Sequence, residues 1–453
     1  MITGTLAEAA RQIDGRLCGP DRAYRAVSTD TRAISEDALF VALRGPSFDG
    51  NGFVSEAARK GAAGAVVSRL QACELTQIEV DDTRRALGLL ACAWRMRFDL
   101  AVIAVTGSNG KTTVKEMLAA ILAHAGPTLS TRGNLNNEIG LPLTLLGLDV
   151  HHRAAVVELG ANHPGEIAYL TGVARPDVGL VTNAAAAHLE GFGTLDAVAR
   201  AKGELFAGLP ASGAAVINAD DRYCPVWRAL AGARRVVTFG LQADADVRAD
   251  RIEQRLGPDG PLLAFNLHLP DGSGPVQLPL AGRHNVANAV GAAAAAWAAG
   301  SELAAIRAGL AAARAAEGRL QWRRGLGGAR IIDDTYNANP RSVAVALEFV
   351  TSLEGRAWVV LGDMRELGDD AAAMHTDIGA LARRLGVERL YALGLLSRHA
   401  AEAFGAGGVW FGAVEELNAA LAPELGKGIN LLVKASRGMR LERVVAAVAE
   451  SAA

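Results

Sequence analysis

The chain has 453 residues, half of them apolar. At about 150 residues a domain, this length predicts about three domains, each with enough apolar residues for a core. The 46 basic and 48 acidic residues leave a net charge of -2, which excludes a strongly basic surface for nucleic acid or for an anionic membrane.

The first 17 residues mix charged and short apolar side chains and lack the apolar centre of a secretion signal. Residues 289–299 come closest to a membrane span, but they are fewer than the roughly 18 apolar residues that a span needs. The four cysteines lack C-x-x-C spacing, so we expect small buried side chains in a reducing compartment. These features predict a cytoplasmic protein without membrane insertion, and we expect a monomer.

In chain order, short apolar segments alternate with helical stretches, which is typical of α/β domains with parallel sheets. Residues 1–83 form a small α/β unit, with strands at 39–43 and 65–68 around a helix at 53–60. A central domain, 84–313, and a last domain, 314–453, follow. The central strands are expected at 102–105, 155–159, 178–182, 214–218 and 235–239, and those of a second, Rossmann-like doubly wound sheet at 330–333, 357–361, 389–393, 408–411 and 430–433.

Residues 246–280 are less regular. They contain Gly257-Pro258, Pro270-Asp271-Gly272 and Pro275, which predict antiparallel hairpins. A packed, alanine-rich helix is expected to begin near His284.

The sequence TGSNGKTT follows the first central strand and precedes a helix predicted at 114–124. Such a turn directs backbone N–H groups and the positive end of the helix at a phosphate, while a lysine meets the outer phosphates and a threonine holds Mg²⁺. The usual first glycine of this pattern is Val105 here, so the loop is a shortened form. The alternative is a glycine-rich turn that only joins a strand to a helix.

Several polar residues follow predicted strands, and ligands of such sheets bind at the carboxyl ends of strands. Glu158 and Thr112 would supply oxygen ligands for Mg²⁺, and His188 follows the next strand, although a lone histidine in a loop is more often structural. On local grounds Lys202 is typical of a solvated helix residue.

Three amide-rich or acidic segments have two interpretations each. Asn136 and Asn137 suit either loop building or recognition of a phosphate or sugar. Asn285 could face a base or cap the helix that it begins. Asp334 could reach a ribose hydroxyl, or could only begin a turn before Pro340.

Taken together, these segments resemble the Mur ligases, the ATP-dependent amide-forming enzymes of peptidoglycan synthesis, and most closely their MurF type. The matching strings are TGSNGKTT, GNLNNEIGLP, ELGANHPGEI, AHLEGFGT, GRHNVANA, DDTYNANP and LGDMRELG, in order along all three predicted domains. The shortened loop is the form that this family carries. Ala186 stands where proline is frequent, Thr335 where serine is, and VKASRG where VKGSRS is usual; the last departure leaves the dipeptide contacts open.

The resemblance implies a role for each matched residue. ATP would lie on Gly107, Ser108, Asn109, Gly110, Lys111, Thr112 and Thr113, with Asn285 at the adenine and Asp334 and Asn337 at the ribose. Mg²⁺ would be bound by Thr112, by Glu158 with His188, and with the help of a carbamylated Lys202. Catalysis would rest on Lys111, Lys202, His188 and Glu158. The first domain would bind the uridine nucleotide through Ser28, Asp30, Arg32 and Asp49, while Asn136 and Asn137 would face the substrate.

The implied reaction joins D-alanyl-D-alanine to UDP-N-acetylmuramoyl-tripeptide through an acyl phosphate, with the dipeptide on the last domain. Three alternatives stay open at this point. A related ligase would add another amino acid such as diaminopimelate, a plain phosphotransferase would form no amide, and a nucleotide-binding partner would catalyse nothing.

Overall fold

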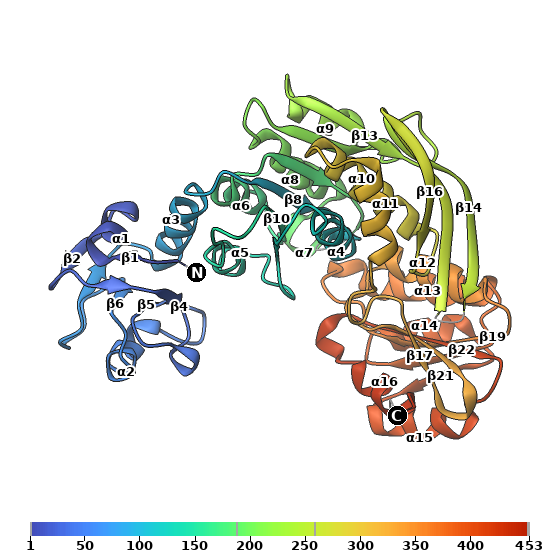
Figure 1. The fold of residues 1–453 in the computed structure, drawn as a ribbon. Helices are drawn as coiled ribbons and strands as arrows, with labels where there is room; N and C mark the ends of the chain where they lie inside the picture. The colour runs from blue at the N-terminus through green and yellow to red at the C-terminus, as the bar shows by residue number, and fades with distance from the viewer. Residues whose placement is uncertain (1, 187–188, 258–259, 451–453) are drawn as a thin grey trace.

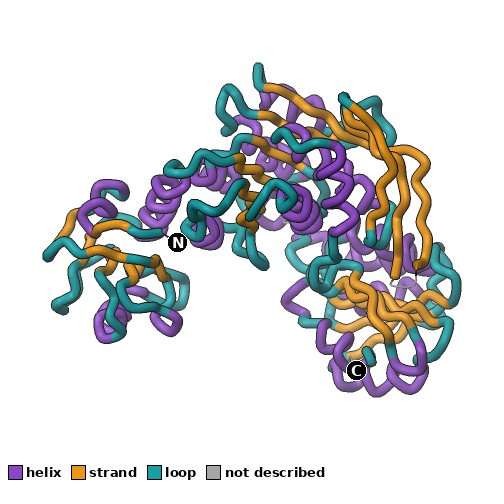
Figure 2. The backbone as a smooth tube through the Cα atoms, in the orientation of Figure 1, coloured by secondary structure: helices purple, strands orange, loops and turns teal. Residues whose placement is uncertain are grey.

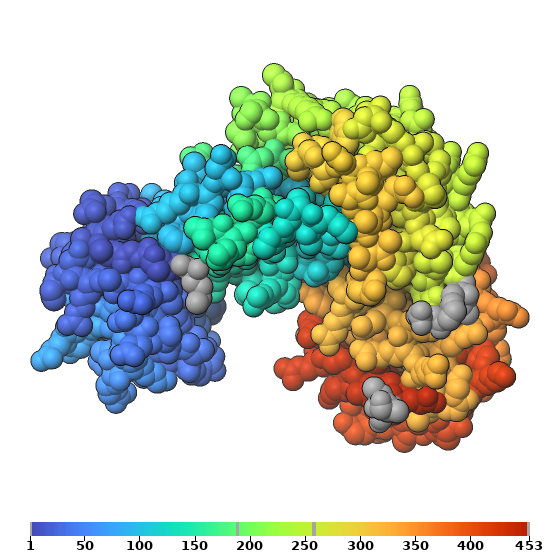
Figure 3. Space-filling model, viewed as in Figure 1, coloured from blue at the N-terminus to red at the C-terminus, as the bar shows by residue number. Residues whose placement is uncertain are grey.

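The computed structural model describes residues 2–186, 189–257 and 260–450. Three α/β domains follow one another along an arch, with the first domain at one end and the last at the other (Figure 1). Figure 2 shows strands in the interior of each domain with helices around them, except for the long strands within residues 247–278, which run along the outer edge of the central domain. In the space-filling view, an open space separates the first and last domains below the central one (Figure 3).

The first domain has a five-stranded sheet in the order β2-β7-β6-β5-β4 and a separate pair, β1 and β3. Pairing is parallel except between β2 and β7 and between β1 and β3. Its elements are β1 (Gly4–Thr5), α1 (Leu6–Gln12), β2 (Arg16–Cys18), β3 (Ala23–Tyr24), β4 (Ala26–Ser28), β5 (Ala38–Val41), α2 (Val54–Arg59), β6 (Gly64–Val67) and β7 (Gln77–Glu79).

Helix α3 (Thr83–Arg95) joins this domain to the central one. Asp82 caps its first turn by accepting hydrogen bonds from two backbone N–H groups. The helix packs on α5 (Gly140–Leu145) and α6 (Glu166–Ala174), and its Leu87 and Leu90 belong to one core with residues of both domains. The junction is therefore a packed helix.

The central domain is built on a nine-stranded sheet in the order β16-β15-β14-β13-β12-β11-β8-β10-β9. The strands are β8 (Ala101–Thr106), β9 (Thr128–Ser130), β10 (Ala154–Glu158), β11 (Val178–Val181), β12 (Ala214–Asn218), β13 (Arg235–Gly240), β14 (Val247–Gly257), β15 (Gly260–Leu269) and β16 (Gly272–Leu278). Pairing is parallel from β9 to β14, and β14, β15 and β16 form the antiparallel hairpins that the turn residues predict.

Helices cover both faces of this sheet because its strands are apolar on both sides. Val102 and Ala104 of β8 pack into one core, whereas Ile103 and Val105 pack into the other. The remaining helices are α4 (Lys111–Leu122), α7 (Leu189–Phe192), α8 (Leu195–Ala207), α9 (Cys224–Ala231), α10 (His284–Ala298) and α11 (Leu303–Ala312). Helix α10 is the packed, alanine-rich helix that the sequence predicts, with ten of its residues buried.

The last domain has a six-stranded sheet in the order β17-β18-β22-β19-β20-β21, parallel except for β17. Its strands are β17 (Gln321–Arg324), β18 (Arg330–Asp334), β19 (Arg356–Gly362), β20 (Arg389–Leu393), β21 (Gly408–Phe411) and β22 (Ile429–Lys434). Its helices are α12 (Pro340–Thr351), α13 (Ala371–Arg384), α14 (Ser397–Phe404), α15 (Val414–Leu421) and α16 (Glu442–Val448).

The predicted strands and helices are confirmed in kind, but the structure adds short strands, moves one helix start and corrects the expected burial of the cysteines. The sequence analysis did not predict the short strands β1, β2, β3, β4 and β7 of the first domain or the edge strands β9 and β17, and Gln-Trp-Arg-Arg of β17 lacks the apolar run of a buried strand. Helix α4 begins at Lys111 rather than at 114, directly after Gly110. The four cysteines are free but only half-buried, so the expectation of buried thiols was wrong. Among the described residues, no helix is long and apolar enough to cross a membrane.

Candidate active site

The loop between β8 and α4 has the geometry of a phosphate cradle. Gly107 and Gly110 have φ values of +140° and +83°, which favour glycine. A Cβ atom on Gly107 would lie 2.0 Å from Thr182 Oγ1, so a side chain there would also clash. Lys111 Nζ donates to the carbonyl of Gly107 at 2.7 Å, and burial lowers the pKa of this lysine. A desolvated cation and the free N–H groups of α4 thus share one turn.

Glu158 and Thr112, which the sequence analysis suggests as oxygen ligands for Mg²⁺, meet beside this loop. Strand β10 pairs with β8, so Glu158 at the end of β10 lies next to the loop. Thr112 Oγ1 donates to Glu158 Oε2 at 2.8 Å, and Asn136 Nδ2 donates to Glu158 Oε1 at 2.8 Å. Hydroxyl and carboxylate oxygens are the donors that Mg²⁺ prefers, so this pair fits the ion.

Arg319 reaches the same threonine from the start of the last domain, although 207 positions separate the two residues. Its Nη2 donates to Thr112 Oγ1 at 2.9 Å, and its guanidinium carbon lies 4.2 Å from the centre of the Tyr336 ring. The sequence analysis missed this residue because no local pattern marks an arginine in the coil before β17. Among the described residues, only its contacts in space with Thr112 and Tyr336 identify it as a site residue.

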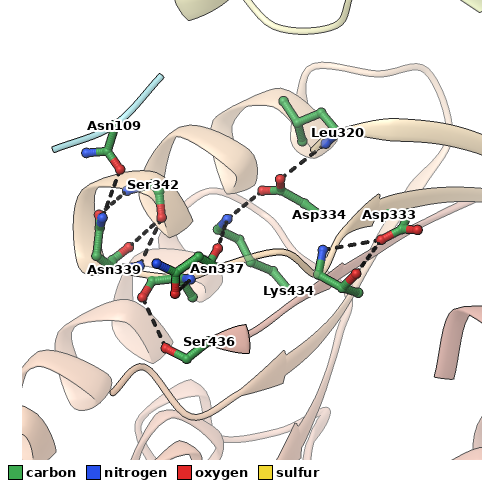
Figure 4. A network of polar contacts seen from close by, with 11 residues as sticks. Asn109, Leu320, Asp333, Asp334, Asn337, Asn339, Ser342, Lys434 and Ser436 are labelled. Carbon is green, nitrogen blue, oxygen red and sulfur yellow. Dashed lines mark hydrogen bonds and ion pairs between the residues drawn. The ribbon is translucent and has the colours of Figure 1, made fainter. Parts of the chain in front are cut away.

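Asp334 lies at the end of β18 and faces Lys434 at the end of β22, where the parallel register places the two residues opposite each other. Lys434 Nζ contacts Asp334 Oδ2 at 2.6 Å and donates to the carbonyl of Asn337 at 2.9 Å (Figure 4). The other carboxylate oxygen of Asp334 accepts from the N–H of Leu320 at 3.1 Å. The predicted ribose ligand is therefore oriented by a buried cation, which the sequence analysis did not single out.

Loss of this cation should destabilise the fold. We expect Lys434→Met to lower the free energy of unfolding by about 3 kcal/mol, because Asp334 would remain buried and unpaired. Urea denaturation followed by circular dichroism measures the change. The double variant Lys434→Met/Asp334→Asn should recover most of the loss; equal destabilisation of the single and double variants would contradict this explanation.

Asn339 connects the last domain to the phosphate loop. As the N-cap of α12, its side chain accepts from the Ser342 N–H at 2.9 Å, and the Ser342 hydroxyl accepts from the backbone N–H of Asn339 at 3.0 Å. Its Nδ2 donates to Asn109 Oδ1 at 2.8 Å across the domain boundary (Figure 4). One side chain thus both begins a helix and fixes that helix against the nucleotide loop.

Substitution of Asn339 should separate these two roles. We expect Asn339→Ala to lower the free energy of unfolding by about 1 kcal/mol through loss of the cap, as measured by urea denaturation. Asn339→Ser keeps a capping oxygen but is too short to reach Asn109, so it should keep most of the stability. A serine variant as unstable as the alanine variant would show that the contact with Asn109 dominates.

Asn285, which is predicted to face the base of the nucleotide, lies in the first turn of α10. Asn285 is buried, its Nδ2 donates to the carbonyl of Ala281 at 2.6 Å, and its Oδ1 accepts from Asn288 at 2.8 Å. The neighbouring His284 lies near Asp334 and Lys434, and desolvation lowers its pKa to about 4. This histidine is therefore neutral at physiological pH.

A cavity of about 570 Å³ unites most of these groups between the central and last domains. Three polar atoms at its wall have no hydrogen-bond partner among the described residues: Asn109 Nδ2, His284 Nδ1 and Arg319 Nε. Unpaired buried donors and acceptors are costly unless a ligand or water satisfies them. Of the residues predicted to bind nucleotide or substrate, the cavity is lined by Ser108, Asn109, Gly110, Lys111, Thr113, Asn136, Asn137, Glu158, Asn285, Asp334 and Asn337.

Lys202 in α8 lies outside the wall of this cavity and is only 1% exposed, so its interpretation as a solvated residue was wrong. Its Nζ lies 5.5 Å from the Phe192 ring centre and 3.5 Å from the carbonyl of Ala161. Burial, followed by the charge of Lys111, lowers the pKa of Lys202 to about 7. At neutral pH much of this amine is unprotonated and nucleophilic.

The first-domain residues predicted to bind a uridine nucleotide form two separate turns. Ser28 and Arg32 are both hydrogen-bonded to Asp30, and the Arg32 side chain lowers the pKa of Asp30 to about 2. Asp49 accepts from the backbone and side chain of Asn51, which lowers its pKa. The structure keeps these residues in the first domain, whereas the 570 Å³ cavity lies between the other two.

Two further predicted site residues are Asn137 and His188. Asn137 Oδ1 accepts from the N–H of Gly140 at 2.9 Å, which supports its loop-building role. His188 lies outside the described residues. Among the residues that are described, no three His, Cys, Asp or Glu side chains gather to hold a metal ion.

Three Mur ligase domain models match consecutive parts of the chain. The Mur ligase family catalytic domain matches residues 23–95, the Mur ligase middle domain 105–296, and the Mur ligase glutamate ligase domain 318–437. The chain is 43% identical to the UDP-N-acetylmuramoyl-tripeptide--D-alanyl-D-alanine ligase of Escherichia coli K12, over 100% of this chain and 99% of that protein. It is 34% identical to the Bacillus subtilis ligase of the same name, with the same coverage.

Solved structures agree with these matches. A crystal structure of MurF from Acinetobacter baumannii superimposes with a TM-score of 0.93 at 37% identity, covering 98% of both chains. The Thermotoga maritima MurF ligase in complex with ADP gives a TM-score of 0.82 at 28% identity, covering 93% of this chain and 96% of that one.

Proposed function

The chain belongs to the Mur ligase family, and from that premise we propose that it joins D-alanyl-D-alanine to UDP-N-acetylmuramoyl-tripeptide at the expense of ATP. The observation that carries this proposal is that Thr112 contacts both Glu158 and Arg319 beside the Lys111 loop, and that Glu158, Arg319 and Asp334 line one cavity. The relatives named for this reaction, including one at 43% identity over the full chain, support the substrate assignment.

The chemistry requires activation of a carboxylate, because oxide is a poor leaving group. The terminal carboxylate oxygen of the tripeptide attacks the γ-phosphorus of ATP, ADP leaves, and an acyl phosphate forms. The dipeptide amine then attacks the acyl carbon, and phosphate leaves as the amide bond forms and the amine loses a proton. Cations placed beforehand lower the barrier of the first step because negative charge moves between the phosphate oxygens.

The residues of this chain divide that work. Lys111 and the N–H groups at the start of α4 meet the outer phosphates, and Arg319 adds a second cation from the last domain. Asp334, which Lys434 orients, accepts from ribose hydroxyls, and Asn285, which lines the same cavity, contacts the adenine in this proposal. When bound, Mg²⁺ would neutralise phosphate oxygens, and Thr112 and Glu158 are the described side chains that would hold it.

The domains take separate substrates in this proposal. Residues 1–83 bind the uridine nucleotide, 84–313 bind ATP, and 314–453 bind the incoming dipeptide. The open space between the first and last domains is where the tripeptide would extend from one site to the other (Figure 3). We propose further that the enzyme works in the cytoplasm, where ATP is supplied, and that it works as a monomer.

A direct assay tests the reaction. The purified chain is incubated with ATP, Mg²⁺, D-alanyl-D-alanine and the UDP-muramoyl-tripeptide that contains diaminopimelate or lysine, and products are read by mass spectrometry. The proposal requires a pentapeptide product with phosphate release that depends on both co-substrates. Product from a free amino acid but not from the dipeptide would instead indicate a related ligase.

A further inference from the structure

Arg319 is held from one side by an aromatic ring and ends on the phosphate loop. Its guanidinium carbon lies 4.2 Å from the centre of the Tyr336 ring, within the range of a cation–π contact. Its Nη2 donates to Thr112 Oγ1, while its buried Nε has no partner among the described residues. The side chain thus spans the gap between the last domain and the loop that carries Lys111.

The backbone around Arg319 is fixed to the segment that carries the ring. The N–H of Tyr336 donates to the carbonyl of Gly318 at 3.0 Å, and the N–H of Leu320 donates to Asp334 Oδ1 at 3.1 Å. Gly318 has a φ of +65°, and a Cβ atom there would lie 3.1 Å from the Tyr336 nitrogen. Both neighbours of Arg319 are therefore tied to residues 334–336, so the arginine and the ring move together.

A second arginine contacts the same ring but is placed differently. The guanidinium carbon of Arg437 lies 5.7 Å from the ring centre, its side chain is 64% exposed, and it pairs with Glu442 at 3.8 Å. Solvent weakens a cation–π contact at that exposure. The closer and less exposed partner of the ring is Arg319.

We propose that Tyr336 is a positioning residue whose ring directs the Arg319 guanidinium at the outer phosphates of the bound nucleotide. The inference rests on the proposed function only in taking ATP as the nucleotide. It assigns the ring face to this role and leaves the hydroxyl without one, since no hydrogen bond of that hydroxyl is found among the described residues. A competing role would place the ring directly against the base or ribose of the nucleotide.

Nucleotide binding separates the two roles without any amide-forming substrate. Calorimetry with Mg²⁺ gives the affinities for ADP and for the non-hydrolysable β,γ-imido analogue of ATP, in Tyr336→Leu, Tyr336→Phe, Arg319→Ala and the double variant Tyr336→Leu/Arg319→Ala. We expect Tyr336→Leu to weaken the analogue about tenfold more than ADP, the order of a desolvated cation–π contact. Tyr336→Phe keeps the ring and should bind both nucleotides like the unsubstituted chain.

The double variant tests directly whether the Tyr336 ring acts through Arg319. If the ring acts through Arg319, Tyr336→Leu should have no further effect once Arg319 is alanine. Equal weakening of ADP and the analogue, loss in the Phe variant, or multiplying effects in the double variant would each overturn the proposal. Thermal denaturation monitors folding, and Tyr336→Met replaces the Leu variant if that fails to fold. A chain that forms no amide yet shows the expected binding pattern would refute the proposed function and leave this inference standing.

Discussion

Lys111→Ala should lower ATP-dependent amide synthesis by about a thousandfold or more. The lysine is the cation of the loop, and its Nζ lies 2.7 Å from the carbonyl of Gly107, where the proposed function puts the outer phosphates. Removal of one preorganised donor from a dry site costs about a hundred- to a thousandfold in rate, and this donor carries a full charge. Mass spectrometry of the pentapeptide product and release of phosphate measure the loss.

Two controls separate a chemical effect from a structural one. Because burial lowers the pKa of Lys111, its charge is held at a cost, so Lys111→Ala should leave the thermal midpoint unchanged or raised. Lys111→Arg keeps the charge on a longer side chain and should retain more activity than the alanine variant. An alanine variant with near-normal turnover would mean that this loop does not bind the reacting phosphates.

The sequence predicted those parts of the site that depend on one strand and the residues that follow it. The phosphate loop is an example, because strand, glycine turn and helix are contiguous and each has a local signal. Glu158 is another, since a residue at the end of a parallel strand must lie at the ligand edge of the sheet. In both cases chain order and sheet topology suffice.

Other parts depend on contacts that no local pattern records. Arg319 meets Thr112 across 207 positions, and Lys434 meets Asp334 across 100. The contact of Arg319 with Thr112 requires the last domain to pack on the central one. The contact of Lys434 with Asp334 requires β18 and β22 to pair. A charged residue beside a turn looks solvated until the partner strand is known.

Lys202 shows the same limit within a single helix. Val198, Ala199, Ala201, Leu205 and Phe206 of α8 are all buried, so its apolar face is wide. The small alanines around the lysine give little contrast between a core face and a solvent face, and periodicity therefore could not place it. The resemblance to the family, rather than the helix pattern, singled out this residue.

Lys202→Ala should lose most activity, and bicarbonate or a short-chain carboxylate should restore part of it. In the proposed enzyme the free amine attacks CO₂ at carbon, releases a proton and becomes a carbamate, which turns a buried cation into an anion near Lys111 and Glu158. The structure supplies the amine for this reaction, since burial lowers the pKa of Lys202 to about 7. Alanine leaves a space into which a small carboxylate can bring the missing charge.

The protonation state of Lys202 sets the direction in which carbamate formation should change with pH. Only the neutral amine reacts with CO₂, and its fraction rises as pH increases through about 7. Activation of the unsubstituted chain by bicarbonate should therefore be slow below pH 6 and faster at pH 8, whereas rescue of Lys202→Ala by acetate should lack this dependence on the lysine. Mass spectrometry of the intact chain under CO₂ should detect an adduct of one CO₂, about 44 Da, that is absent from Lys202→Ala. A silent substitution, or an adduct that forms equally well at pH 6, would contradict the role given to this lysine.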